Sequence, residues 1–294
     1  MKNLNKKAFS LIELSIVILI IGIIIAGVTQ SSRLISAYKL QIAESLTTSS
    51  PVASIKNLVL WLESTSSKSF KDAETQDASK ISVWYDINPQ TSYPNNASQD
   101  TSDARPQYSS NCINNLPCLN FDGVGTFVSF DGTSIVNSNY SVIVVEERKA
   151  AGTNFFLAGT GSTDNSNLLL GYRGDTNPTF GQYNNDYDIA IDAFSNPIPR
   201  IHTYIFNSLA TTAKTYHING AAQTLVSAGG SPVMSNPLTS FEGASVGRFS
   251  DSGPAMYFNG AIGEVIIFNR ALRESERTAI EAYLGKKWNI AISS

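Results

Sequence analysis

The sequence predicts a mainly β chain: an antiparallel sandwich that follows one long, membrane-spanning N-terminal helix and ends in a short C-terminal helix. Three observations support this prediction. An uncharged, Ile-rich run occupies residues 14–32 of the 294. Short apolar runs separated by polar turns follow from residue 52 to residue 269, and an amphipathic segment closes the chain at residues 273–288.

The composition excludes several classes of protein. The 21 Lys and Arg side chains are balanced by 24 Asp and Glu, so the net charge is −3 and nucleic-acid binding is not expected. Two Cys are too few for a disulfide framework or a Cys-rich metal centre, and two His leave little for metal or acid–base chemistry. The 14 Phe and 12 Tyr fit a β-rich, exported domain.

The uncharged run is long enough to cross a bilayer. Its 19 residues would extend roughly 28 Å as a helix, close to the hydrocarbon thickness of about 30 Å. Lys2, Lys6 and Lys7 precede it, which predicts a single span of the inner membrane with the C-terminal domain outside the cytoplasm. A cleaved secretory signal fits less well, because the run is long and Glu13 stands at its start. A plain anchor with Glu13 at the headgroups is the other alternative.

The segment KKAFSLIELSIVILIIGIIIAG resembles the N-termini of type IV pilins and of type II secretion pseudopilins. The resemblance implies that residues 1–8 are a leader, which a prepilin peptidase removes between Ala8 and Phe9, and that Phe9 is then N-methylated. It also implies that Glu13, the fifth mature residue, serves subunit assembly. Two positions depart from the family pattern: Ala8 replaces the usual Gly, and Gln30 stands where many pilins have a helix-bending Pro.

Glu13 has a physical reason to select a partner. An isolated carboxylate is costly in lipid or in a filament core, and it gains by pairing with the free amino group of Phe9 on a neighbouring subunit. This pairing would select one stagger between adjacent helices. The expected partners are therefore other pilin subunits.

The helical pattern continues beyond the uncharged run. We expect a helix from Phe9 to about Leu46, roughly 57 Å long, within a helical region of residues 9–50. It should end at Ser49–Pro51. An apolar stripe at i+4 spacing should pack against the globular domain. The stripe consists of Leu34, Tyr38, Ile42 and Leu46.

Residues 52–269 carry the strand pattern of the sandwich. Asn219-Gly220 predicts a tight hairpin turn. The closing segment predicts a helix with Ile280, Tyr283, Leu284 and Trp288 on one face. The clearest expected strands are 58–62, 81–85, 126–130, 140–147, 155–159, 168–172, 187–191, 202–207, 214–219 and 261–269.

Residues 55–290 resemble the concanavalin A-like (laminin-G-like) jelly-roll domains of bacterial surface proteins. The resemblance rests on LVLWLESTS, LPCLNFDGVGTFVSF and YHINGAAQ, and above all on the closing pattern from Gly260 to Leu272. It implies a jelly-roll domain over residues 51–294. Such folds serve carbohydrate binding, adhesion, glycoside cleavage or spacing, so the resemblance alone does not choose among them.

The sequence does not predict an enzyme. Glu264 in the closing strand invites a catalytic interpretation, but a structural pairing with Arg270 or Arg248 is favoured. No E-x-D-x-x-E motif occurs, and Glu146 and Glu147 are adjacent, so on a strand they point to opposite faces. His202 and His217 lie on predicted strands with no acid at useful spacing. They are expected to be packing or surface residues.

Two candidate binding features remain. Asp122, Asp131 and Asp251 lie beside Gly-containing turns and are candidate calcium ligands, with ordinary turn chemistry as the favoured alternative. Tyr183 and Tyr187, in the loop QYNNDYD, are candidates for stacking on a sugar.

Cys112 and Cys118 predict a structural disulfide in an exported domain. A hairpin with a three-residue loop would place them opposite each other. Closing so small a ring would stabilise the fold by roughly 2 kcal/mol in the chain-entropy model.

The favoured function is a type IV pilin-like subunit whose head is a lectin-like domain, displayed on an extracellular pilus for adhesion to a glycan or host surface. The large head favours a minor subunit, for example one at the filament tip. One alternative is a pseudopilin of a type II secretion system, located in a periplasmic pseudopilus. The other is a membrane-tethered enzyme that acts on glycans.

Overall fold

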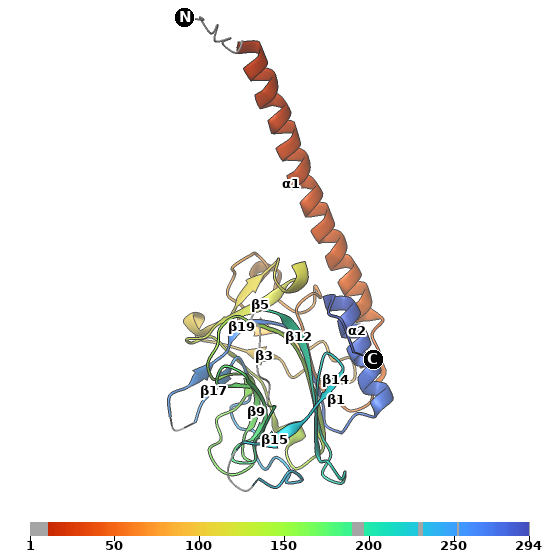
Figure 1. Ribbon diagram of the computed structural model, residues 1–294, viewed down its shortest axis with the longest axis vertical. Helices are drawn as coiled ribbons and strands as arrows, with labels where there is room; N and C mark the ends of the chain where they lie inside the picture. Colours follow the sequence, from red (N-terminus) through yellow and green to blue (C-terminus); the bar gives the residue numbers. More distant parts are fainter. Residues whose placement is uncertain (1–10, 190–196, 229–231, 252, 294) are drawn as a thin grey trace, which may run out of the picture.

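The computed structural model consists of a long helix that projects from a β-sandwich (Figure 1). It describes residues 11–189, 197–228, 232–251 and 253–293. Helix α1 runs without interruption over Leu11–Thr48. The expected start at Phe9 lies outside the described residues, and the helix ends two residues beyond the expected Leu46. Its described side chains from Leu11 to Ile25 are exposed. Across these ranges, no helix has both the length and the apolar character needed to cross a membrane.

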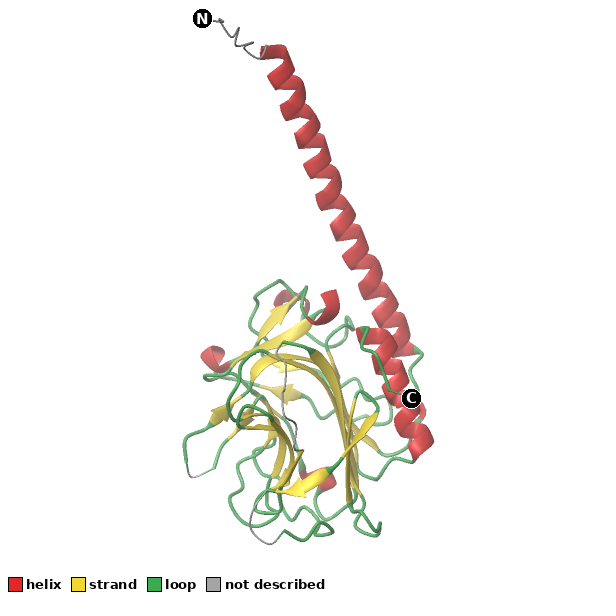
Figure 2. Ribbon diagram, viewed as in Figure 1, coloured by secondary structure: helices red, strands yellow, loops and turns green. Residues whose placement is uncertain are grey.

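Within the described ranges, the strands form one eight-stranded sheet, one nine-stranded sheet and a two-stranded ribbon, all antiparallel (Figure 2). The eight-stranded sheet has the order β14 (Ala221–Gln223), β13 (Lys214–Ile218), β12 (Pro199–Phe206), β7 (Tyr140–Arg148), β19 (Asn259–Phe268), β5 (Cys118–Asp122) and β4 (Gln107–Ser109), with β1 (Leu58–Glu63) also paired to β19.

The nine-stranded sheet forms the second layer. Its order is β15 (Leu225–Ser227), β11 (Tyr187–Ile189), β10 (Asn177–Gln182), β9 (Leu168–Arg173), β8 (Asn154–Ala158), β16 (Ser245–Val246), β6 (Val128–Ser129), β3 (Ala97–Ser98) and β2 (Val83–Trp84). The ribbon pairs β17 (Arg248–Phe249) with β18 (Met256–Tyr257). Short 3₁₀ turns occur at Val52–Ser54, Asp72–Glu74, Ser102–Ala104, Ile113–Asn115 and Thr133–Ile135.

Apolar side chains fill two separate layers, and strand β19 contributes to both. Val265 and Ile267 join the core between the two sheets, whereas Ile266 and Phe268 join a second core on the outer face of the eight-stranded sheet. Alternate side chains of a strand point to opposite faces, so a strand buried on both sides reads as a continuous apolar run. The second core is the one on which the helices pack.

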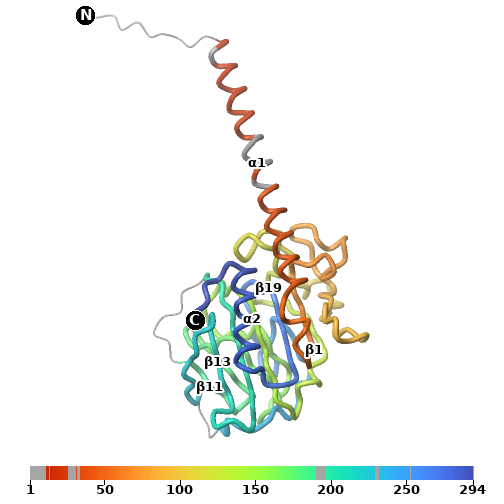
Figure 3. The backbone as a smooth tube through the Cα atoms, turned by 90° about the vertical axis from the view of Figure 1, so that its right-hand side faces the viewer, coloured from red at the N-terminus to blue at the C-terminus, as the bar shows by residue number. Residues whose placement is uncertain are grey.

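Helix α2 (Glu274–Trp288) covers the second core. Its predicted apolar face is confirmed: Ile280, Tyr283, Leu284 and Trp288 are all buried. Figure 3 shows α2 beside the lower end of α1, and Ala43 of α1 is buried in the same core. Asn289 follows the last helical residue as its C-cap and adopts the left-handed conformation, with a φ of 51°.

The sequence located most strands. Each of the ten expected runs contains an observed strand, although residues 190 and 191 lie outside the described part of the chain. The Asn219-Gly220 turn joins β13 to β14 with φ of 49° and 82°, as a tight hairpin requires. The expected runs do not include β3, β4, β5, β10 and β14 to β18; of these, β5 and β10 are the longest.

The prediction that the α1 stripe packs on the head is wrong for three of its four residues; the fourth, Leu46, is partly buried and packs against the second core. Leu34, Tyr38 and Ile42 are 70%, 65% and 42% exposed. The face of α1 that contacts the head instead carries Ala43 and Thr47, which are buried. Small side chains there allow α1 to approach α2 closely, whereas Leu34, Tyr38 and Ile42 are exposed.

The disulfide also has a different setting from the one expected. Cys112 and Cys118 are bonded, but Ser109, not Cys112, lies opposite Cys118 in the β4–β5 pairing. The connection is a longer loop that contains a 3₁₀ turn at Ile113–Asn115, where Asn114 adopts a φ of 49°. The three-residue hairpin loop was therefore a wrong prediction.

Candidate functional site

Two carboxylates and a lysine form a buried ionic cluster beneath α2. Glu63 of β1 and Glu264 of β19 are directly opposite each other in the sheet. Nζ of Lys287 donates to Oε2 of Glu63 at 2.8 Å and to Oε2 of Glu264 at 2.9 Å. The indole N–H groups of Trp61 and Trp288 also donate to Glu264, at 2.8 and 3.0 Å. All three charged side chains are fully buried.

This cluster corrects the expected partner of Glu264. The carboxylate pairs with Lys287, and not with Arg270 or Arg248. Burial by itself lowers the pKa of Lys287, but the carboxylates of Glu264 and Glu63 outweigh it, and the pKa lies above its usual value. Glu264 is therefore a structural group that fixes α2 on the sheet.

The cluster continues into α1. The hydroxyl of Tyr283 donates to Glu264 at 2.9 Å and lies 3.3 Å from the Oγ1 of Thr47. Desolvation by burial holds the pKa of Tyr283 well above its usual value, so the phenol remains a hydrogen-bond donor. The last turns of α1 are thus connected to the sheet through α2.

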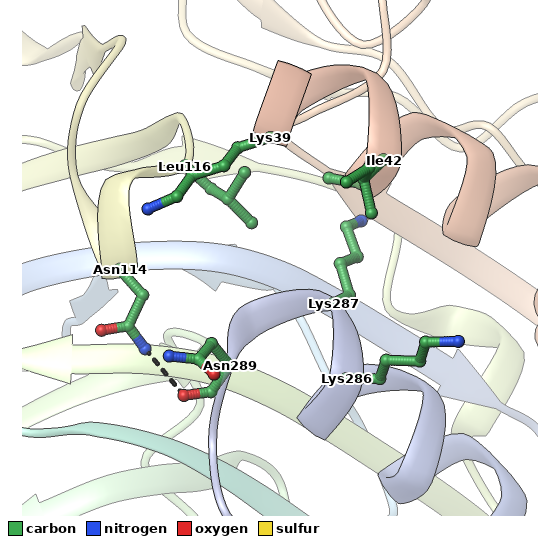
Figure 4. Close-up of a pocket in the computed structure, with 8 residues that line it drawn as sticks. Lys39, Ile42, Asn114, Leu116, Lys286, Lys287 and Asn289 are labelled. Atoms are coloured by element: carbon green, nitrogen blue, oxygen red, sulfur yellow. Dashed lines mark hydrogen bonds between the residues drawn. The ribbon is translucent and has the colours of Figure 1, made fainter. Parts of the chain in front are cut away.

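A crevice of about 310 Å³ lies between the two helices (Figure 4). Nζ of Lys39 donates to Oδ1 of Asn115 at 3.1 Å, and Nδ2 of Asn114 donates to the carbonyl of Trp288 at 2.7 Å. Figure 4 shows Lys287 pointing toward α1 and Lys286 pointing to the side. Because Lys39 and Lys287 are engaged within the protein, the crevice is a joint between helix and head.

A second polar cluster lies in the core between the sheets. His202 is fully buried, and its Nε2 lies 2.8 Å from Oε1 of Glu146. Tyr172 donates to the same oxygen at 2.6 Å, and Tyr216 contacts Nδ1 of His202. Burial lowers the pKa of His202, against the effect of Glu146. The expectation that this histidine lacks an acid partner was wrong, because the partner comes from the neighbouring strand β7.

The other histidine stays near the surface. His217 is half-buried on β13, and its pKa falls to about 4 because of burial and of the positive charge of Arg277. The neutral imidazole lines a shallow pocket beside α2.

The best candidate for a binding site is a pocket of about 320 Å³ on the outer face of the nine-stranded sheet, a volume at the small end of the range for ligand pockets. Phe155 of β8, Leu169 of β9 and Phe249 of β17 form its apolar floor, each at most 5% exposed. The rings of Phe155 and Phe249 meet edge to face with centroids 5.6 Å apart. Tyr183 packs against this group and remains partly exposed. We call this the β8–β9 pocket.

Polar groups form the rim of the β8–β9 pocket. Arg173 pairs with Asp186 at 2.7 Å and with Asp188 at 3.4 Å. Asn184 and Asp251 complete this side of the pocket. Burial raises the pKa of Asp188, against the hydrogen bond from Thr179 and the charge of Arg173. An apolar floor with a few convergent polar groups is the usual design of a small-molecule site.

The structure brings two of the predicted residues together in this pocket, Tyr183 and Asp251. Tyr187 does not belong to it. That side chain is 8% exposed, and its hydroxyl donates to the carbonyl of Pro232 at 3.2 Å. The sequence missed Phe155 and Phe249. A signal existed for Phe155: two consecutive Phe residues on a strand must face opposite ways, and Phe156 fills the core.

The three candidate calcium ligands each bond to the backbone of their own turn. Oδ1 of Asp122 accepts the N–H of Val124 and of Gly125, at 2.8 and 2.9 Å. Burial alone would raise the pKa of Asp122, but these bonds lower it overall. Asp131 accepts the N–H of Thr133, and Asp251 accepts that of Gly253, at 2.9 and 2.7 Å.

These bonds have the geometry of turn chemistry. In the described part of the chain, no group of three or more His, Cys, Asp or Glu is arranged to hold a metal ion. Calcium binding by the three aspartates stays a prediction.

The predicted N-terminal site cannot be placed in the same way. Ala8 and Phe9 lie outside the described residues. Glu13 lies in α1, and its side chain is not among those described.

Comparisons with known proteins address both halves of the chain. Residues 3–29 match the prokaryotic N-terminal methylation motif. No curated protein matches the sequence. Among solved structures, domain 4 of AbnA, a GH43 extracellular arabinanase from Geobacillus stearothermophilus in complex with arabinotriose, has a TM-score of 0.51 at 16% identity. The match covers 76% of this chain and 98% of that one.

Two further structures are similar at lower scores. A Trypanosoma rangeli sialidase has a TM-score of 0.48 at 15% identity, over 88% of this chain and 39% of that one. The CBM40 domain of the Ruminococcus gnavus IT-sialidase, bound to α2,3-sialyllactose, has a TM-score of 0.41 at 14% identity, over 51% and 85%. At these identities the similarity to the arabinanase domain shows the fold alone. The chain thus carries a type IV pilin N-terminal motif joined to a jelly-roll-like β-sandwich.

Proposed function

We propose that this chain is a minor type IV pilin-like subunit that displays a carbohydrate-binding head. The observation that carries the proposal is the continuity of the parts. The methylation motif at residues 3–29 runs into α1, and the last turns of α1 are fixed to the sandwich through Thr47 and Tyr283. A peptidase-processed helix would thereby present a folded head.

In this proposal, the apolar end of α1 inserts into the inner membrane before assembly. Residues 14–32 carry no charge, and the described side chains from Leu11 to Ile25 are exposed on α1. An exposed apolar surface of this kind gains free energy when it leaves water. Carbonate extraction of membranes tests this step: the chain should stay in the pellet, and its release into the supernatant would contradict insertion.

Glu13 would then direct assembly by pairing with the methylated amino group of Phe9 on a neighbouring subunit. The test is Glu13→Gln, which keeps the shape of the side chain and removes its charge. Membrane insertion should be unchanged, whereas incorporation into filaments should fall at least tenfold on immunoblots of sheared filaments. Ser10→Ala serves as a control in the same segment. Wild-type incorporation of the Gln variant would refute the pairing.

The minor role follows from size. A head of about 240 residues on each helix would crowd a tight helical array, so the subunit should be sparse along the filament or sit at its tip. Quantitative mass spectrometry of purified filaments measures the subunit ratio. A filament in which this chain is the dominant component would refute the minor role.

The β8–β9 pocket supports carbohydrate binding by the head. The nonpolar face of a sugar ring suits the floor of Phe155, Leu169 and Phe249, and the rim supplies hydrogen-bonding groups. The arabinanase domain with this fold is itself described in complex with arabinotriose. Binding without catalysis is part of the proposal, because Glu264, the acid first considered for catalysis, is fully buried and pairs with Lys287.

A glycan array probed with the full-length chain in detergent tests the head. The wild type should bind at least one class of saccharide, and Tyr183→Ala should weaken that binding about tenfold by removing an aromatic wall of the pocket. Tyr93→Ala is the matched control, since Tyr93 is 88% exposed and lies outside the pocket. An array without any bound saccharide would refute this half of the function.

A further inference from the structure

The β8–β9 pocket is lined by more negative than positive side chains. Among its described lining residues, Arg173 is the only cation, and Asp186 and Asp251 are acids. Behind the rim, Asp188 also lies 3.4 Å from Nε of Arg173. Arg173 pairs with two of these three carboxylates, and the buried Lys214, which does not line the pocket, also interacts electrostatically with Asp186. Carboxylates still outnumber cations around the pocket.

Arg173 is already committed to its neighbours. Its Nη2 donates to Oδ2 of Asp186 at 2.7 Å, while Asp186 and Asp188 are themselves buried. The single positive charge of this partly exposed guanidinium already lies beside two carboxylates, so this group of side chains is net negative. An anionic ligand that approached it would meet a net repulsion. Arg173 thus positions the acids of the rim and is not a free anion receptor.

A second arginine, on the ribbon strand that carries Phe249, does not reach the pocket. Arg248 precedes Phe249 on β17, and side chains alternate along a strand. Because Phe249 faces the pocket, Arg248 points away, and its Cζ lies 3.6 Å from the centroid of the Phe127 ring. It cannot offset the acids of the rim.

Asp251 adds an acid that no described cation balances. One of its carboxylate oxygens accepts the N–H of Gly253 at 2.7 Å, and the residue is only partly buried. On the same rim, Nδ2 of Asn184 donates to Oδ1 of Asp164 at 2.8 Å, which places a further carboxylate beside the pocket. A ligand carboxylate would meet like charges on two sides of a partly desolvated pocket.

We propose that the β8–β9 pocket selects uncharged sugar residues and rejects acidic ones, such as sialic and uronic acids. This inference rests on the proposed carbohydrate binding and adds the substrate class. The hydroxyl groups of a neutral sugar can donate to the carboxylates of Asp251 and Asp186, while its apolar face lies on Phe155 and Phe249. A carboxylate has acceptors only, so it can make no such bond.

The test compares matched pairs of saccharides that differ at one carboxyl group: galactose with galacturonic acid, and the methyl ester of sialyllactose with sialyllactose itself. Binding is measured by biolayer interferometry on the full chain in detergent. The neutral member of a pair should bind at least tenfold more tightly at low ionic strength. This difference in affinity should decrease as salt is added, because the exposed rim charges are screened.

The variant Asp251→Asn should reduce the ratio of affinities between the neutral and the acidic saccharide of a pair at least threefold. Glu274→Gln is the control. It also removes one carboxylate, but from α2, which packs on the other sheet, and it should leave the affinity ratio unchanged. Thermal melts confirm that both variants are folded. Equal or tighter binding of the acidic partners would overturn the inference while leaving carbohydrate binding intact. Absence of binding to both members of every pair would overturn the inference together with the proposed function.

Discussion

At the residue scale, the decisive group is Lys287. It forms ion pairs with both Glu63 and Glu264, two carboxylates that face each other across β1 and β19 and are fully buried. A buried pair of this kind contributes little net stability relative to apolar packing, but it is costly to break on one side only. Its role is to specify where α2 lies, since only one position of α2 places a cation between the two acids.

The first prediction concerns this lysine. Lys287→Met keeps much of the length and volume of the side chain but leaves two uncompensated buried carboxylates. We expect a loss of about 3–5 kcal/mol in the free energy of unfolding, measured by urea denaturation of the full chain in detergent. Lys286→Met is the matched control, because Lys286 is adjacent and exposed. A Lys287 variant as stable as this control would contradict the assignment.

Single residues mark the limit of what the sequence can predict. Tyr183, as a candidate for sugar stacking, and Asp251, as a candidate calcium ligand, could be selected from the sequence because aromatic and acidic residues beside turns are local signals. The partners of Glu264 and His202 were not found, because Lys287 and Glu146 are 23 and 56 positions away along the chain. The prediction that Tyr187 is free to stack on a sugar was wrong for a related reason, since this side chain is buried. Alternation shows which strand residues share a face, but not which face is covered.

At the element scale, helix α2 is fixed at its start by one acid. The guanidinium of Arg270 donates twice to Glu276, at 2.8 Å each, and the backbone N–H of Arg273 donates to the same carboxylate at 2.9 Å. The hydrogen bonds from Arg270 are the largest cause of a pKa of about 2 for Glu276, compared with 4.5 for a free side chain. The carboxylate also satisfies an N–H group that the helix start leaves without a partner.

The second prediction follows from this pKa. Because the folded-state value lies below the unfolded value, the stabilisation is fully present above pH 4.5 and is lost as the pH falls toward about 2. Glu276→Gln should remove about 1–2 kcal/mol at pH 7, after allowance for solvent screening, and should flatten the loss of stability between pH 4.5 and 2. Urea denaturation at pH 3 and pH 7 measures both effects. If the free energy of unfolding of the Gln variant fell with pH as steeply as that of the wild type, the role assigned to Glu276 would be refuted.

Strands differ in how far sequence alone reveals them. Strand β7 reads as YSVIVVEER, with the β-branched and apolar residues typical of a buried strand, and it was predicted within one residue. Strand β10 reads as NPTFGQ, and its Pro and Gly argue against a strand by propensity. It exists because β9 pairs with it along its whole length, which is a tertiary effect.

At the scale of the whole molecule, the sequence predicted a helix followed by an antiparallel sandwich, and the described structure has both. It did not predict how they join. Of the predicted i+4 stripe, only Leu46 packs on the second core, while Leu34, Tyr38 and Ile42 are exposed. The rest of the contact uses the small residues Ala43 and Thr47, whose pattern carries no hydrophobic signal. Close approach of two helices requires small side chains, as at Ala43, where α1 meets the core beneath α2.

The third prediction tests that joint. Ala43 is 1% exposed, so Ala43→Trp cannot fit between the helix and the head and should separate α1 from α2 at a cost of about 1–3 kcal/mol. Double electron–electron resonance between spin labels at Ser45→Cys and Leu209→Cys measures the distance from α1 to the head. The Ala43→Trp variant should give a broader distribution, centred at a longer distance, than the wild type. Gln41→Trp, at an exposed position on the same helix, should leave the distribution narrow. A narrow distribution in the Ala43 variant would show that the joint tolerates the bulk.

The account as a whole depends on processing at the N-terminus, since only a chain cut by the prepilin peptidase can offer an amino group to Glu13 of its neighbour. Mass spectrometry of the chain purified from its native membranes and filaments tests this most directly. We predict that the N-terminal peptide begins at Phe9 and carries an N-methyl group. A mature chain that begins at Met1 and retains residues 1–8 would contradict the account.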